Sequence, residues 1–227
     1  MLRRLVIIAA LVLAAPAATA ERTIRITVLG DSLVAGFRIS EDDAFPAKLE
    51  RMLRTKGLSV EVINAGVSGD TTSAGLARLD RSIPEGTDAV IVELGTNDVW
   101  RALPPSVTHA ALQEIVQRLR RRDIDILLCG AWPARLGDAL YYGEVSAMFA
   151  DLAEKNGLIF YPYFLEGVEG DPKLTLDGLH PNPAGVDEIV ARILPSVEEL
   201  VAMSALPPIA DVRWWIQVRI WLDEYTP

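Results

Sequence analysis

The stretch Ile24-Arg25-Ile26-Thr27-Val28-Leu29-Gly30-Asp31-Ser32-Leu33 joins an apolar run to a short turn motif. The run predicts a β-strand, because apolar and β-branched residues favour strands. The turn motif then places a serine hydroxyl just after the strand, where a reactive oxygen can be exposed. Far along the chain, Asp177-Gly178-Leu179-His180 supplies a carboxylate and an imidazole three positions apart. Together the two motifs contain every group that serine-based acyl transfer requires.

The rest of the chain alternates between strand-like and helix-like patterns. Five apolar runs rich in β-branched residues predict strands: Ile24–Leu29, Val60–Asn64, Ala89–Leu94, Asp125–Cys129 and Leu158–Tyr161. Four stretches with helical periodicity follow them: 44–56, 106–122, 138–156 and 182–200. Strands that alternate with helices predict βαβ units and a parallel sheet covered on both faces. The chain is therefore expected to have an α/β fold.

Composition excludes several classes of function. The 227 residues suit one α/β domain, and 31 acidic against 22 basic residues give a net charge of −9. Such an acidic chain lacks the basic surface that nucleic acid or anionic lipid requires. Cys129 is the only cysteine, so no intramolecular disulfide can form, and its place in an apolar run predicts a buried side chain. With two histidines and no ligand spacing or phosphate-binding glycine loop, we expect no metal and no cofactor.

The first twenty residues resemble an export signal. Arg3 and Arg4 form a positive region, Leu5 to Ala15 an apolar region, and Ala18-Thr19-Ala20 a small-residue cleavage site. The apolar region is short for a membrane span, although an uncleaved anchor is the alternative. We expect residues 1–20 to be a signal peptide that is removed near Glu21. Removal would leave 20 basic and 31 acidic residues, a net charge of −11, in a periplasmic or secreted protein without a stable membrane span.

Residues 203–227 depart from the alternating pattern, so we predict one main domain over 21–202 and a separate extension after it. Pro207-Pro208 should end the last helix. Between residues 212 and 222, apolar and polar side chains alternate with strand-like spacing. The extension could add an edge strand or touch a membrane surface, but a segment without a catalytic role is the favoured interpretation.

Four short motifs fall just after predicted strands. They are Gly30-Asp31-Ser32-Leu33, Gly66-Val67-Ser68-Gly69-Asp70, Gly95-Thr96-Asn97-Asp98 and Asp177-Gly178-Leu179-His180. The carboxyl ends of parallel strands share one edge of a sheet, and ligands bind at that edge. Motifs that are far apart in the sequence should therefore converge on one crevice.

With these four blocks in order, the chain resembles the GDSL, or SGNH, hydrolase family, and most closely its bacterial thioesterase/arylesterase/lysophospholipase branch. The resemblance covers about residues 23–200. It implies the SGNH hydrolase fold, a flavodoxin-like three-layer α/β/α sandwich with a five-stranded parallel sheet in the order 2-1-3-4-5. It also implies hydrolysis of carboxylic esters or thioesters, with aryl esters, acyl thioesters or lysophospholipids as small-molecule substrates.

The resemblance also implies roles for individual residues. Ser32 would be the nucleophile, His180 its general base, and Asp177 the carboxylate that orients the imidazole. The backbone N–H groups of Ser32 and Gly69 and the side-chain amide of Asn97 would stabilise the oxyanion. Each residue also has a structural interpretation: Ser32 could cap a helix, and the others could be turn or solvated loop residues.

Two further expectations concern specificity. Trp132 follows the fourth strand, so we predict that it borders the crevice and contacts the acyl group, on position alone. Alternative functions on the same fold are a carbohydrate acetylesterase and an acyltransferase, in which an alcohol replaces water as the acceptor. A non-catalytic binding module is disfavoured, since every catalytic position is filled.

Overall fold

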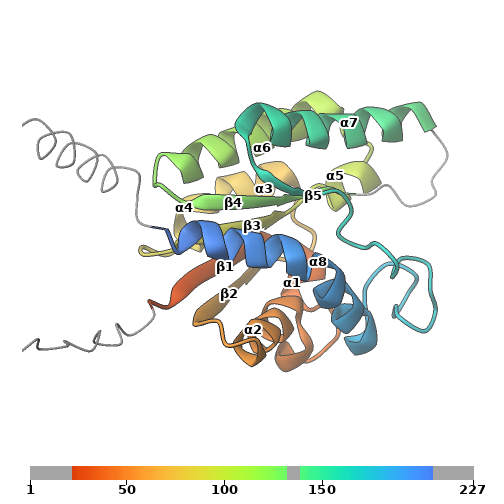
Figure 1. Ribbon diagram of the computed structural model, residues 1–227. Helices are drawn as coiled ribbons and strands as arrows, with labels where there is room; N and C mark the ends of the chain where they lie inside the picture. The colour runs from red at the N-terminus through yellow and green to blue at the C-terminus, as the bar shows by residue number, and fades with distance from the viewer. Residues whose placement is uncertain (1–21, 132–138, 207–227) are drawn as a thin grey trace, which may run out of the picture.

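Five parallel strands form the centre of the molecule in a computed structural model that describes residues 22–131 and 139–206. The strands are β1 (Ile24–Gly30), β2 (Val60–Gly66), β3 (Ala89–Glu93), β4 (Asp125–Cys129) and β5 (Ile159–Tyr161). Their order is β2-β1-β3-β4-β5, and all neighbours are parallel (Figure 1). The predicted strands and the predicted order are thus confirmed.

Long helices cover the sheet, as the periodicity predicted, and short ones follow strand ends. The long helices are α2 (Phe45–Thr55), α6 (Pro105–Arg120), α7 (Ala139–Asn156) and α8 (Pro183–Ser204). The short ones are α1 (Ser32–Ala35), α3 (Thr72–Ala77), α4 (Leu79–Ser82), α5 (Thr96–Trp100) and the 3-10 helix η1 (Glu41–Asp43). The short helices were not predicted, because three to six residues are too few to show a repeating hydrophobic pattern.

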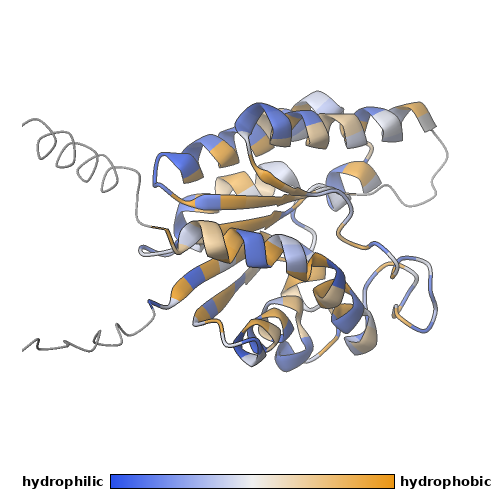
Figure 2. Ribbon diagram, viewed as in Figure 1, coloured by the Kyte–Doolittle hydropathy of each residue, from blue (hydrophilic) through white to orange (hydrophobic). Residues whose placement is uncertain are grey.

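Two hydrophobic clusters, one on each face of the sheet, hold the three layers together. Ile26 and Val28 of β1 point to the face covered by α1, α2 and α8, whereas Leu29 points to the opposite face. This alternation follows from the two-residue period of a strand. Figure 2 shows that the strands are largely hydrophobic and that the covering helices mix hydrophobic and hydrophilic residues. The clusters fix the strand ends, and with them the motifs that follow each strand.

Three of the predicted features lie outside the described residues: the signal peptide, Trp132, and the extension beyond residue 206. The last helix runs to Ser204, beyond the predicted end at residue 200. None of the helices in the two described ranges is both long and apolar enough to cross a membrane.

The carboxyl group of Glu93 lies inside the molecule at the end of β3, where its side chain is almost completely buried. The backbone N–H of Asp31 donates to its Oε2 atom over 3.4 Å. Burial and the neighbouring Asp31 carboxylate both raise the pKa of Glu93 well above its usual range. Glu93 therefore keeps its proton to a higher pH in the folded protein than in the unfolded chain.

Replacing Glu93 by the neutral glutamine tests this protonation state. Because a raised pKa makes the folded state hold a proton that the unfolded chain releases, the wild type should lose stability as the pH rises above the unfolded pKa of about 4.3. The Glu93→Gln variant lacks this linkage, so its free energy of unfolding in urea should fall less between pH 5 and pH 8. The exposed Glu85→Gln serves as the matched control. An identical pH dependence in Glu93→Gln and wild type would show that Glu93 is ionised in the fold.

Candidate active site

A tight turn at the end of β1 presents Ser32. Gly30 allows the turn because a Cβ atom there would lie 2.3 Å from Cγ2 of Val34. The Asp31 carboxylate accepts the backbone N–H of Leu33 over 3.0 Å and so caps α1. Ser32 is then the first residue of α1, with its side chain half-buried at the edge of the sheet.

The turn brings Ser32 into contact with a residue 148 positions away. Its Oγ atom lies 3.1 Å from Nε2 of His180, and Nδ1 of the same ring lies 2.8 Å from Oδ2 of Asp177. These distances are within hydrogen-bond range, so hydroxyl, imidazole and carboxylate form one continuous chain. The structure thus brings together the three residues that the sequence predicted to meet.

The loop that carries Asp177 is ordered by its own backbone. Oδ1 of Asp177 accepts the N–H groups of His180 and Leu179, over 2.8 and 3.2 Å. Burial alone would raise the pKa of Asp177, but these bonds and the imidazole lower it below its usual value. The carboxyl is therefore ionised, which is the form that accepts Nδ1–H from the ring. The Phe37 ring lies 4.4 Å from the His180 ring, between centroids, and limits its movement.

Two backbone N–H groups near Ser32 are available to a ligand. Within the described residues, neither the N–H of Ser32 nor that of Gly69 donates a hydrogen bond. Gly69 has φ +85°, a conformation that other residues rarely adopt. A Cβ atom there would meet only Nη2 of Arg101, at 4.0 Å. The backbone conformation, rather than crowding within the protein, therefore accounts for glycine at this position.

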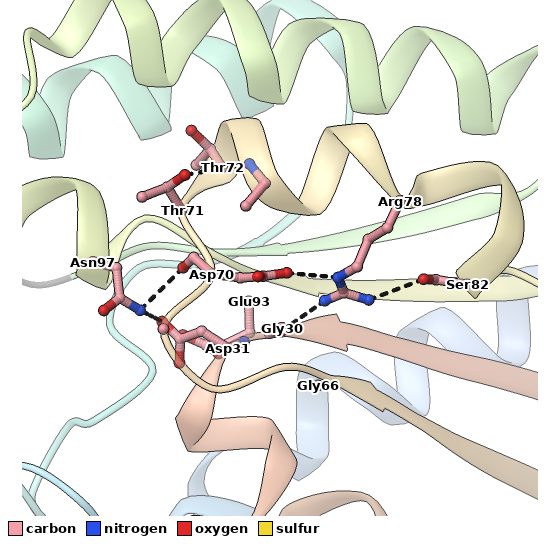
Figure 3. Close-up of polar contacts among 12 residues, drawn as sticks. Gly30, Asp31, Gly66, Asp70, Thr71, Thr72, Arg78, Ser82, Glu93 and Asn97 are labelled. Carbon is pink, nitrogen blue, oxygen red and sulfur yellow. Dashed lines mark hydrogen bonds and ion pairs between the residues drawn. The ribbon is translucent and has the colours of Figure 1, made fainter.

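Asn97 lies in the first turn of α5 and connects three segments of the site. Its side-chain amide donates to Oδ2 of Asp31 over 2.8 Å and to the backbone carbonyl of Asp70 over 3.0 Å (Figure 3). Both amide hydrogens thus already have acceptors. Burial raises the pKa of Asp31 to about 6, against the lowering effect of its bonds from Leu33 and Asn97.

Sequence reasoning missed two buried charged residues that support these segments. Asp98, next to Asn97, accepts the backbone N–H and hydroxyl of Thr72, over 2.8 and 2.6 Å, and the hydroxyl of Thr108 over 3.1 Å. Arg78 pairs with Asp70 at 2.5 Å. The sequence did offer a signal for Asp98, because it is the last residue of the motif Gly95-Thr96-Asn97-Asp98. Nothing in the residue type of Arg78 distinguishes it from a surface arginine.

A cavity of about 560 Å³ lies at the opposite edge of the sheet, beside Ile24, Leu58 and Val201, and neither Ser32 nor His180 lines it. Ligands of parallel sheets bind at the carboxyl ends of strands, so this cavity is not the candidate site. No group of three or more His, Cys, Asp or Glu residues in the described ranges could hold a metal ion.

Comparison with known proteins agrees with this geometry. The GDSL-like lipase/acylhydrolase family matches residues 28–187. An arylesterase of Vibrio mimicus is 35% identical over 78% of this chain and 91% of its own length. A thioesterase 1/protease 1/lysophospholipase L1 of Escherichia coli is 38% identical, over 68% of this chain and 74% of its own length.

A solved structure supports the same assignment. The crystal structure of AlinE4, an SGNH-hydrolase family esterase, is 40% identical, with a TM-score of 0.66 over 83% of this chain and all of that chain. The family match spans the β1 turn and most of the sheet. The resemblance seen in the four sequence motifs is therefore confirmed: the chain belongs to the GDSL-like lipase/acylhydrolase family and is an esterase of the GDSL type.

Proposed function

We propose that the chain hydrolyses carboxylic esters or thioesters through an acyl-serine intermediate, with Ser32 as the nucleophile. The observation that carries this proposal is the contact of 3.1 Å from Oγ of Ser32 to His180, together with the contact of 2.8 Å from His180 to Asp177. A serine hydroxyl is a weak nucleophile unless a base accepts its proton. His180 is placed to do so, and the ionised Asp177 stabilises the charged ring that results.

The reaction then has two steps. In the first, Oγ of Ser32 bonds to the carbonyl carbon while its proton passes to Nε2 of His180. The bond to the leaving oxygen or sulfur breaks, and His180 returns the proton to that leaving group. In the second, His180 takes a proton from water while the water oxygen bonds to the acyl carbon. The bond from that carbon to Oγ of Ser32 then breaks, His180 returns the proton to Oγ, and the acid departs.

Three donors would stabilise the negative oxygen that forms in each step. The backbone N–H groups of Ser32 and Gly69 have no acceptor among the described residues, which suits this role. The third donor is Asn97, whose hydrogens bond to Asp31 and Asp70 in the free protein. Asn97 would share one of these hydrogens with the oxyanion when substrate binds.

The substrates that we propose are aryl esters, acyl thioesters and lysophospholipids. Support comes from the names of the relatives, an arylesterase and a thioesterase/lysophospholipase, and from the exposure of the Asp177 loop, which leaves the site open to solvent. Trp132 remains our candidate for the residue that contacts the acyl chain, since it follows the end of β4 by three residues in the sequence.

Substitution of Ser32 and Asn97 tests the proposed roles. Ser32→Ala should abolish hydrolysis of a p-nitrophenyl ester, and Asn97→Ala should lower kcat by about 10²–10³, the usual loss for one oxyanion donor. Ser59→Ala is the matched control, because the Ser59 hydroxyl bonds to Thr23 at the opposite edge of the sheet. Steady-state kinetics on folded variants provide the measurement. If Ser32→Ala were as active as Ser59→Ala, Ser32 would not be the nucleophile and the proposal would be wrong.

We also propose that the protein is exported, with residues 1–20 as the signal, 21–202 as the hydrolase domain and 203–227 as an extension. The positive region, apolar region and Ala18-Thr19-Ala20 support this organisation. When the full chain is expressed in a Gram-negative host, the periplasmic fraction should contain a protein that begins near Glu21, by N-terminal sequencing. Ala20→Arg should leave the precursor uncut, because the cleavage site requires small residues. A wild-type protein that keeps residues 1–20 would contradict the assignment.

A further inference from the structure

The guanidinium of Arg78 lies beneath the candidate site, with only 6% of the side chain exposed. Its Nε atom donates to Oδ2 of Asp70 over 2.5 Å, Nη2 to the backbone carbonyl of Gly30 over 3.0 Å, and Nη1 to the hydroxyl of Ser82 over 3.0 Å (Figure 3). One planar group therefore binds three different segments. Two of these segments carry proposed oxyanion donors.

The first of these segments is the end of β1. Gly30 is separated from Ser32 by Asp31 alone, so its carbonyl fixes the start of the turn that presents the nucleophile. The same carbonyl accepts the backbone N–H of Val67 over 3.0 Å, in the loop that leads to Gly69. Arg78 thus adds a bond at the point where the two donor-bearing segments already meet.

The second segment is the loop that contains Gly69. Asp70 is the next residue, and its carboxylate is the charged partner of Arg78. The backbone carbonyl of Asp70 accepts the amide of Asn97. Every proposed oxyanion donor therefore lies within two residues, or one further hydrogen bond, of a residue that Arg78 contacts.

We infer that Arg78 is a positioning residue, whose guanidinium holds the segments bearing the three proposed oxyanion donors in a fixed relative arrangement. The inference rests on the proposed function. Arginine suits this task because its donors are fixed in one plane, whereas the lysine ammonium is a flexible point charge. Small displacements of catalytic groups are costly, since a shift of about 1 Å can lower a rate by about 10²-fold.

The conservative variant Arg78→Lys separates positioning from charge. It keeps the positive charge beside Asp70 but cannot reach Gly30 and Ser82 with the same fork. For a p-nitrophenyl ester, kcat should fall by about 10- to 100-fold with little change in KM, because the donors act on the transition state. Arg122→Lys is the matched control, since that guanidinium binds the backbone carbonyls of Ile83 and Pro84 away from the site. Circular dichroism confirms that each variant is folded.

A double-mutant cycle with Asn97→Ala tests whether Arg78 acts through the oxyanion donors. If it does, Arg78→Lys should lower kcat much less in the Asn97→Ala background than in the wild type, because the loss is shared. Equal losses in both backgrounds would overturn the inference. Should Arg78→Lys not fold, Asp70→Asn removes the charged partner and should produce the same lowered kcat and the same coupling.

The outcomes also separate this inference from the proposed function. If Ser32→Ala is inactive while Arg78→Lys and Arg122→Lys both retain wild-type kcat, the positioning role of Arg78 is wrong and the proposed function stands. If Ser32→Ala retains activity, both fall, since the donors named here would then not serve the reaction.

Discussion

The parallel arrangement of the strands is the constraint on which the site depends. Parallel strands end at the same edge of a sheet, and the two hydrophobic clusters hold β1 inside the sheet, between β2 and β3. The turn after β1 and the loop before α8 can therefore meet, although Ser32 and His180 are 148 residues apart. The imidazole and the carboxylate of Asp177 come from one short loop, so a single approach of that loop to the β1 turn assembles all three groups.

Beneath these groups lie buried polar residues, and the cost of burying a charge is offset in a different way at each of them. The buried Arg78 and Asp70 form an ion pair, which compensates the loss of water around both. Glu93 forms no ion pair within the described residues, and burial together with the Asp31 carboxylate raises the pKa of its carboxyl group. Asp31 is an intermediate case: burial raises the pKa of its carboxyl group, and hydrogen bonds from Leu33 and Asn97 oppose that rise. Rigid, satisfied polar groups of this kind are what preorganised oxyanion donors require.

The sequence predicted those parts of the molecule that leave a periodic or local signal. Strands and long helices follow from hydrophobic spacing, and the four motifs indicated which strand ends carry polar groups. The burial of Arg78 and Glu93 could not be predicted, because it depends on how distant segments pack. The two hydrogen bonds of the Asn97 amide could not be predicted for the same reason, since Asp31 and Asp70 come close to Asn97 only in the folded chain. The short helices were missed because they span less than two helical turns, which is too short for a hydrophobic pattern to repeat.

The central claim is that the contact with His180 makes the Ser32 hydroxyl nucleophilic. The claim is tested directly by reaction with an alkyl fluorophosphonate, which labels activated serines covalently. The labelled protein is digested, and the masses of its peptides are measured by mass spectrometry. The account predicts one phosphonyl group per chain, on the peptide that contains Ser32, and much slower labelling of a folded His180→Ala variant. Labelling of another residue, or equal labelling rates for the wild type and His180→Ala, would contradict it.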